Sequence, residues 1–196
     1  MARLLRHTLL LALTALAFAG AAQAAGGNYV FDGGSRGEQE QVRAALNVST
    51  FPWGIVSQQV TIHIVRGIPS SEAAPGQIWL DANLLDAGQL SWGVVQHEYA
   101  HEVDFLLLDP ARRAILSQQL GGSAWDSSVP GLAHAAYGCE RFASTLAWSY
   151  WPSAANVMKP QSANDESAAM PPAKFRALIA GLLDDPALAS VPTLRR

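Results

Sequence analysis

The residues of this chain best suited to chemistry form a short motif at positions 97–101, His-Glu-Tyr-Ala-His. The motif lies in a largely apolar run, 91–108, which contains no proline and one glycine and therefore favours a helix. On a helix, His97 and His101 project from one face a single turn apart, so both imidazoles can reach one Zn²⁺ at about 2.0–2.1 Å. Glu98 starts the same turn and can take a proton from water bound to that metal.

The motif could be a metal site or a chance spacing of histidines on an ordinary helix surface. The flanking residues help to decide between these two interpretations. They are strongly apolar, with Val94, Val95, Val103 and Phe105 followed by three leucines. A helix of this composition is expected to be largely buried. Two buried histidines and a buried glutamate without a metal or other partners would cost several kcal/mol in desolvation. The context therefore favours a metal site.

A catalytic zinc usually has three protein ligands and one open position for water, so a third ligand is expected elsewhere in the chain. A ligand six residues after the second histidine is excluded, because that position is Leu107. The remaining candidates are His134, Cys139 and Glu140 on 132–150, which we expect to form one long helix despite Gly138. Neighbours on a helix point about 100° apart, so Cys139 and Glu140 cannot easily face one metal.

Glu140 begins the segment Glu-Arg-Phe-Ala, thirty-nine positions after His101. Here the chain resembles the gluzincin type of zinc metallopeptidase, in which an HExxH helix pairs with a glutamate on a later helix. The resemblance covers about 60–150, comprising two strands, the HExxH helix and the glutamate-bearing helix. It implies that His97, His101 and Glu140 are zinc ligands and that Glu98 is the general base.

The chain departs from this family pattern at one position. Many gluzincins carry aspartate four residues after the ligand glutamate, and here that residue is Ser144. The hydrogen-bond partner that orients a ligand histidine must then come from elsewhere. Asp104 is a candidate, because it follows His101 by three residues and His97 by seven on the same helix face.

Four further side chains near the candidate site could have functional or structural roles. Tyr137 lies one turn before Glu140 on the expected helix and could stabilise an oxyanion, or could be a core aromatic. His134 could be a metal ligand, a hydrogen-bond donor to a reacting oxygen, or an exposed residue at the helix start. Cys139 is expected to be a small buried hydrophobe, and Arg141 could pair with a substrate or be structural.

The order of the expected strands and helices predicts an α+β domain. The resemblance to gluzincins implies a zincin-like arrangement, with a small sheet packed on the HExxH helix and further helices after it. Strands are expected at 28–35 (or an extended lead-in), 60–65 and 77–80, and helices at 38–47, 91–108, 111–120, 132–150 and 173–183. Loops are expected at 66–76 and 122–131. We also expect a mobile loop at 153–172 and a loose tail over 185–196.

Residues 1–24 have the pattern of a signal peptide that is removed on secretion. Arg3 and Arg6 make a basic start, 9–19 is an apolar core, and 22–24 reads Ala-Gln-Ala, the small-x-small pattern of a cleavage site. The apolar stretch is short for a membrane span, and a retained N-terminal anchor is the alternative.

Removal of that segment leaves a single domain over 25–196 and moves the formal net charge from −3 to −5. A mildly acidic protein has no electrostatic footprint for nucleic acid. Cys139 is the only cysteine, so no internal disulfide can form. We expect a monomer with no membrane association after cleavage of the signal peptide.

The function predicted from these observations is that of a secreted zinc-dependent metallopeptidase acting on a peptide or protein substrate. A strand edge at 77–80 or 60–65 could receive the substrate backbone as an added strand. One alternative is a non-catalytic, metal-stabilised binding protein on the same scaffold. Another is a hydrolase of a non-peptide amide.

Overall fold

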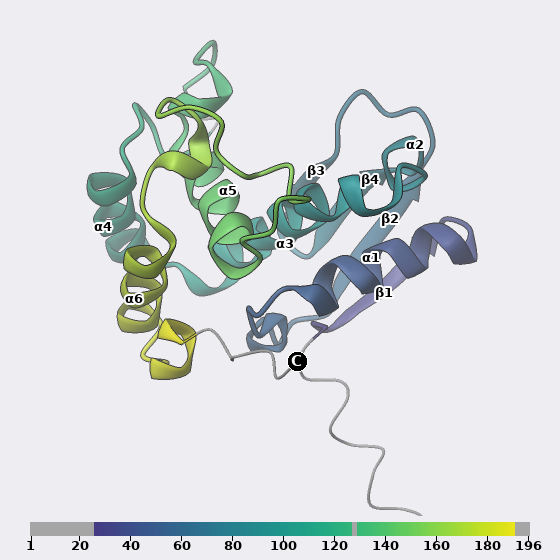
Figure 1. Ribbon diagram of the computed structural model, residues 1–196, viewed down its shortest axis with the longest axis horizontal. Coiled ribbons are helices and arrows are strands. Elements are labelled where there is room, and N and C mark those ends of the chain that lie inside the picture. Colours follow the sequence, from purple (N-terminus) through teal and green to yellow (C-terminus); the bar gives the residue numbers. More distant parts are fainter. Residues whose placement is uncertain (1–25, 127–128, 191–196) are drawn as a thin grey trace, which may run out of the picture.

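The alternating strand predicted at 60–65 is an inner strand of a four-stranded sheet in the computed structural model, which describes residues 26–126 and 129–190 (Figure 1). The strand order is β1-β2-β4-β3. β1 (Tyr29–Gly33) and β4 (Gln77–Asp81) run parallel to β2 (Val60–Val65), and β3 (Glu72–Ala74) is antiparallel to β4. The predicted signal peptide, 1–24, lies outside the described residues, as does 191–196.

Helix α1 (Arg36–Val48) makes the crossover between the parallel strands β1 and β2, as the amphipathic pattern predicts. Ser35 and Glu38 form a capping box at its start, because each side chain accepts a hydrogen bond from the backbone N–H of the other. Val42, Ala45 and Leu46 on its inner side are fully buried. The helix therefore covers one face of the sheet.

The two faces of β2 differ as its alternation predicts. Val60, Ile62 and Ile64 belong to the buried core, whereas Val65 on the other face is 40% exposed. His63 lies on this second face but does not point freely into solvent. Its ring stacks on Trp79 and contacts Asp32 at 2.8 Å, which leaves its side chain 19% exposed.

Strand β3 is a feature that the sequence pattern does not indicate, because three residues inside a loop rich in proline, glycine and serine are too few for a periodic signal. Its presence corrects the predicted place for an added substrate strand. β2 and β4 each pair with a neighbour on both sides, so neither has a free edge. The edges of this sheet are β1 and β3.

Helix α3 (Trp92–Leu107) carries the HExxH motif and packs against α1, β3 and α5 (Gly138–Tyr150), close to the predicted bounds. It follows two short helical turns, α2 (Ala82–Leu85) and η2 (Gly88–Ser91). Ser91 precedes α3 but its side chain does not cap the helix, since its hydroxyl donates to the carbonyl of Gly88 within η2. α3 is buried along most of its length, which agrees with its apolar flanks.

The remaining helices, α4 (Pro110–Leu120) and α6 (Pro172–Leu182), follow the predicted ranges. Asp109 caps α4 by accepting a hydrogen bond of 2.8 Å from the N–H of Arg112. The described residues thus form an α+β fold with six α-helices and a small mixed sheet. Within 26–126 and 129–190, no helix has the length and apolar character needed to span a membrane.

The long helix predicted at 132–150 starts only at Gly138, after the short turn η3 (His134–Ala136). The preceding loop explains the late start. Its residues Ala124 and Trp125 accept hydrogen bonds from the N–H groups of Gly138 and Cys139, at 2.7 and 2.8 Å. The Trp125 ring lies so close to Gly138 that an added Cβ would meet it at 2.8 Å.

The segment predicted as a loop at 153–172 contains a short turn, η4 (Glu166–Ala168), and packs on α5. Asn156 within it is 2% exposed and donates to the carbonyls of Ala147 and Trp151. The predicted tail begins with η5 (Pro186–Ala189), in which Leu188 is buried. Both segments therefore add to the core around the C-terminal helices.

Glu102 on α3 provides a test of how the helix packs on the sheet. The residue is fully buried; one oxygen accepts from the N–H of Gly76 at 2.8 Å, and the other has no hydrogen-bond partner among the described residues. Burial raises the pKa of Glu102 to about 7. The folded protein therefore holds this proton more tightly than the unfolded chain, and stability is lost as the pH rises through about 7.

We expect Glu102→Gln to raise the melting temperature at pH 8 and to change it little at pH 5. The gain at pH 8 corresponds to at most about 3 kcal/mol, since each unit of pKa shift is worth about 1.4 kcal/mol. Thermal unfolding at both pH values, with a chelator present, measures it. Glu72→Gln, at an exposed position on β3, is the control. Equal shifts at the two pH values would contradict the prediction.

Candidate metal centre

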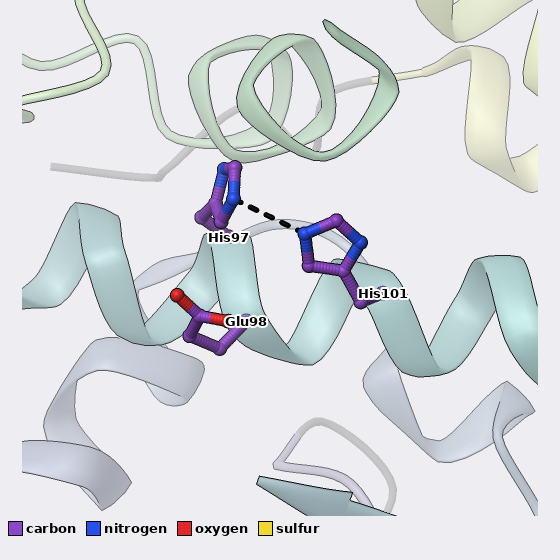
Figure 2. A group of neighbouring side chains, drawn as sticks. All are labelled: His97, Glu98 and His101. Carbon is purple, nitrogen blue, oxygen red and sulfur yellow. Dashed lines mark hydrogen bonds between the residues drawn. The ribbon is translucent and has the colours of Figure 1, made fainter. Parts of the chain in front are cut away.

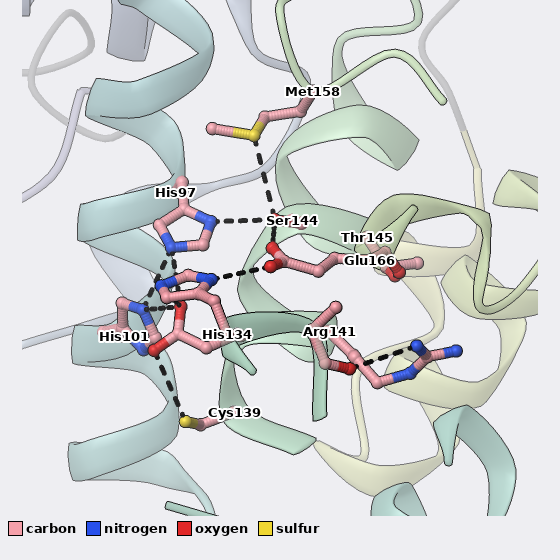
Figure 3. Close-up of polar contacts among 11 residues, drawn as sticks. His97, His101, His134, Cys139, Arg141, Ser144, Thr145, Met158 and Glu166 are labelled. Carbon is pink, nitrogen blue, oxygen red and sulfur yellow. Dashed lines mark hydrogen bonds and ion pairs between the residues drawn. The ribbon is translucent and has the colours of Figure 1, made fainter. Parts of the chain in front are cut away.

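The two motif histidines converge with a carboxylate from α5 (Figure 3). The Oε2 atom of Glu140 lies 3.0 Å from Nε2 of His97 and 3.3 Å from Nε2 of His101. The two Nε2 atoms are 3.2 Å apart. Ligand atoms in a tetrahedron about 2.0–2.1 Å from Zn²⁺ are separated by about 3.3–3.4 Å, so this nearly equilateral triangle has the size of one face of a zinc site.

Two imidazole nitrogens and a carboxylate oxygen can stay this close only when protons or a cation lie between them. Burial alone would raise the pKa of Glu140, but hydrogen bonds from His101 and His97 outweigh it and hold the pKa well below the usual range. Burial would likewise lower the pKa of His101, yet its hydrogen bond to Glu140 and the nearby carboxylates raise it. The centre therefore favours positive charge, and its donor set fits a metal ion.

Glu98 lies beside the two histidines on α3 (Figure 2). One of its carboxylate oxygens is within 4.8 Å of a ring nitrogen of both His97 and His101, and the residue is 6% exposed. Burial raises the pKa of Glu98, although the two histidines partly offset the effect. The predicted general base is thus close to the centre and has a greater affinity for a proton than an exposed glutamate.

His134 reaches the same carboxylate from η3, not from the helix on which it was expected. Its Nε2 atom lies 3.2 Å from Oε2 of Glu140, and its Nδ1 atom lies 2.6 Å from Oε1 of Glu166. The side chain is 65% exposed, whereas those of His97 and His101 are 7% and 9% exposed. The centre is therefore most accessible at His134.

Two surface cavities of about 330 and 470 Å³ lie away from this centre. The first is lined by residues that include Leu106, Arg112 and Leu188, and the second by residues that include Trp148 and Met170. None of the residues that line them belongs to the histidine and glutamate cluster. The chemistry of the side chains, and not the size of a hollow, identifies the candidate site.

The predicted place of Tyr137 is wrong, because α5 begins only after this residue. Tyr137 therefore does not share a helix face with Glu140. Its hydroxyl donates a hydrogen bond of 2.8 Å to the carbonyl of Val129 in the preceding loop. A role in stabilising an oxyanion has no support from this arrangement.

Cys139 lies closer to the centre than its position on the helix predicts. Its sulfur is 3.7 Å from Oε1 of Glu140, and it forms a group with His101 and Glu140 whose ligand atoms are all within 4.8 Å of one another. Neighbours on a helix point in different directions, but the long side chain of Glu140 extends far enough for its carboxylate to lie near the Cys139 sulfur. The angle between the two positions alone does not predict this contact. Burial raises the pKa of the Cys139 thiol, so the thiol stays protonated.

The expected partner of a ligand histidine is also corrected. Asp104 contacts Arg113 at 2.7 Å and Trp125 at 3.1 Å, and so anchors α4 and the loop after it. Ser144 instead lies at hydrogen-bond distance from His97, with its Oγ atom 3.0 Å from Nδ1. The residue at which the chain departs from the gluzincin pattern is therefore the one that contacts His97.

Glu166 is the site residue that sequence reasoning missed. It accepts a hydrogen bond of 2.7 Å from Ser144 and contacts His134. Its segment is rich in serine, alanine, asparagine and proline and carries no periodic or motif signal. Arg141, another candidate, donates to the carbonyls of Leu120 and Ala135 and is structural.

Comparisons with protein-family models, with curated proteins and with solved structures found no match to this chain. The structure itself shows buried groups of histidine, glutamate and cysteine side chains that could bind a metal ion. The resemblance to gluzincins rests on the motif and on the glutamate of the later helix.

Replacement of His97, His101 or Glu140, whose atoms form the triangle, should abolish tight zinc binding. We expect the protein to bind about one Zn²⁺, and His101→Ala or Glu140→Ala to lower the affinity by more than about 100-fold, beyond the loss typical of residues that only contact a ligand. Competition with a chromophoric chelator measures the affinity. His63→Ala, on the outer face of the sheet, is the control and should bind zinc normally.

His134→Ala separates two roles for the exposed histidine. If its ring only lies against the centre, the variant should keep zinc affinity within about tenfold of the wild type. A loss as large as that of His101→Ala would make His134 a ligand. The same chelator competition decides between them.

Proposed function

We propose that this protein is a secreted zinc metallopeptidase of the gluzincin type, with His97, His101 and Glu140 as ligands and Glu98 as general base. The observation that carries the proposal is the position of Glu140 Oε2, 3.0 and 3.3 Å from the Nε2 atoms of the two histidines. A zinc ion held there would polarise a substrate carbonyl and lower the pKa of water.

Glu98 is suited to move the proton in this reaction. Its buried carboxylate lies beside His97 and His101, where the attacking water would stand. It takes a proton as the water attacks the scissile carbonyl, and it then returns that proton to the leaving amine. Because burial raises the pKa of Glu98, the carboxylate is a stronger base than an exposed glutamate.

His134 is suited to contact the oxygen of the reacting carbonyl. Its hydrogen bond to Glu166 is the main cause of a raised pKa, so the ring can hold protons on both nitrogens. With Nδ1 engaged by Glu166, the Nε2 atom faces the centre and can donate to a developing oxyanion. Its exposure places it where a substrate would enter.

Strand β3 is the sheet edge suited to a peptide substrate. Among the described residues it pairs with β4 alone, and it packs against the helix that carries Glu98. An extended peptide added to this edge would receive main-chain hydrogen bonds beside the centre. A peptide or protein substrate, a monomeric enzyme and a location outside the cell, the last from the pattern of 1–24, complete the proposal.

A second candidate is a secreted binding protein stabilised by its metal, without turnover. Structural zinc sites close with four protein ligands, and here both His134 and Cys139 offer a further donor next to Glu140. Glu98 argues against this candidate, because a purely structural site has no use for a base beside the metal. A non-peptide amide is a third possibility that the same chemistry could serve.

Glu98→Gln distinguishes these candidates. We expect the variant to bind zinc with an affinity near that of the wild type and to lose hydrolysis by at least about 100-fold, the lower end of what a general base contributes. Digestion of a broad peptide library, with and without chelator, measures the activity. Glu102→Gln, one turn later on α3, is the matched control and should remain active.

The outcomes differ for each alternative. Full activity of Glu98→Gln would remove this residue from the chemistry. A wild-type protein that binds zinc tightly but cleaves no library peptide would contradict the peptidase and leave the binding protein or the amide hydrolase. Cleavage that persists in chelator would contradict a metal-dependent reaction.

A further inference from the structure

Glu166 places both of its carboxylate oxygens on residues of the metal centre, although it lies in a different segment of the chain (Figure 3). Oε1 lies 2.6 Å from Nδ1 of His134, and Oε2 accepts a hydrogen bond of 2.7 Å from the Ser144 hydroxyl. That hydroxyl oxygen lies 3.0 Å from Nδ1 of His97. One carboxylate therefore contacts His134 directly and His97 through a single hydroxyl group.

The direction of these hydrogen bonds follows from the number of hydrogens available. A carboxylate only accepts, so the Ser144 hydroxyl donates its single hydrogen to Glu166. The Ser144 oxygen can then only accept from His97, which requires that Nδ1 of His97 carry a proton. Once a metal ion replaces the proton that Nε2 shares with Glu140, the lone pair on Nε2, the nitrogen that faces Glu140, is the one free to bind that ion. By the same reasoning, Nδ1 of His134 carries a proton.

The position of Glu166 is well defined by its surroundings. Thr145 on α5 donates to its backbone carbonyl at 3.3 Å, and the next residue, Ser167, is 5% exposed. Burial alone would raise the pKa of Glu166, but hydrogen bonds from His134 and Ser144 lower it below the usual range. The side chain is 19% exposed and stays ionised as an acceptor.

We propose that Glu166 is a positioning residue of the metal centre: it holds the proton on Nδ1 of His97 through Ser144 and on Nδ1 of His134 directly, and so turns Nε2 of both rings toward Glu140. The proposal deepens the proposed zinc site and rests on it. A ligand histidine that is anchored through its second nitrogen binds a metal more tightly, because its tautomer and orientation are set beforehand.

Three variants test this chain of hydrogen bonds. Glu166→Gln keeps the length of the side chain but offers one acceptor oxygen in place of two. Ser144→Ala removes only the branch to His97. We expect each to lower zinc affinity by about 10–100-fold in chelator competition. The double variant, Ser144→Ala with Glu166→Gln, should bind zinc at most about twofold more weakly than the single variant with the lower zinc affinity. Both changes break the same chain of hydrogen bonds, so their effects should not add.

Nitrogen-15 NMR of the histidine rings gives a readout that a merely structural role would not produce. In the wild-type protein His97 should show the Nδ1-protonated tautomer, and both single variants should lose it. The His134 signals should change in Glu166→Gln and not in Ser144→Ala. Asp165→Asn is the matched control, since this carboxylate lies in the same segment and, among the described residues, accepts hydrogen bonds only from residues 161 and 162.

The proposal is overturned if Glu166→Gln leaves both the zinc affinity and the His97 tautomer unchanged. It is also overturned if Asp165→Asn weakens zinc binding as much, because a loosened segment would then explain the effect. A wild-type protein that binds no zinc would contradict the proposed function instead. In that case NMR of the metal-free protein still decides the role of Glu166, through the presence or loss of the proton on Nδ1 of His97 and of His134.

Discussion

The meeting of two imidazole nitrogens with one carboxylate oxygen is the interaction on which the rest of this structure depends. His97, His101 and Glu140 bring these atoms within 3.0–3.3 Å of one another in a largely buried place. Such a cluster is costly to desolvate unless positive charge lies among the three atoms. The packing of α3 against α5 therefore brings together side chains that could bind a cation.

Small side chains lie on the faces of both helices that carry the cluster. By their helical spacing, Ala100 shares a face of α3 with His97 and His101, and Ala143 and Ala147 share a face of α5 with Glu140; all three alanines are fully buried. Ser144, also small, can then reach the ring of His97 and pass the contact on to Glu166. The segment after α5 thus completes a set of contacts that begins on α3, and the C-terminal third of the chain takes part in building the centre.

The elements that the sequence predicts well are those with a strong local pattern. β2 alternates over six residues, and α3 lies in an apolar-rich run without proline, so both have the expected bounds within a residue or so. β3 is too short to show a period, and α5 starts late because Ala124 and Trp125 pair with its first residues. These differences arise from contacts between distant segments, which a local pattern does not contain.

The amino-acid sequence by itself determined which residue types the centre offers: two histidines one helical turn apart and a glutamate between them. It also limited the candidates for a third metal ligand to a few residues, which included Glu140. A helical repeat is a local property, so spacing suffices for this much. Only the tertiary structure decided that Glu140, His134 and Cys139 all lie at one place, that Ser144 and not Asp104 contacts His97, and that Glu166 lies behind it. Those contacts depend on how distant segments pack, and no spacing along the chain encodes them.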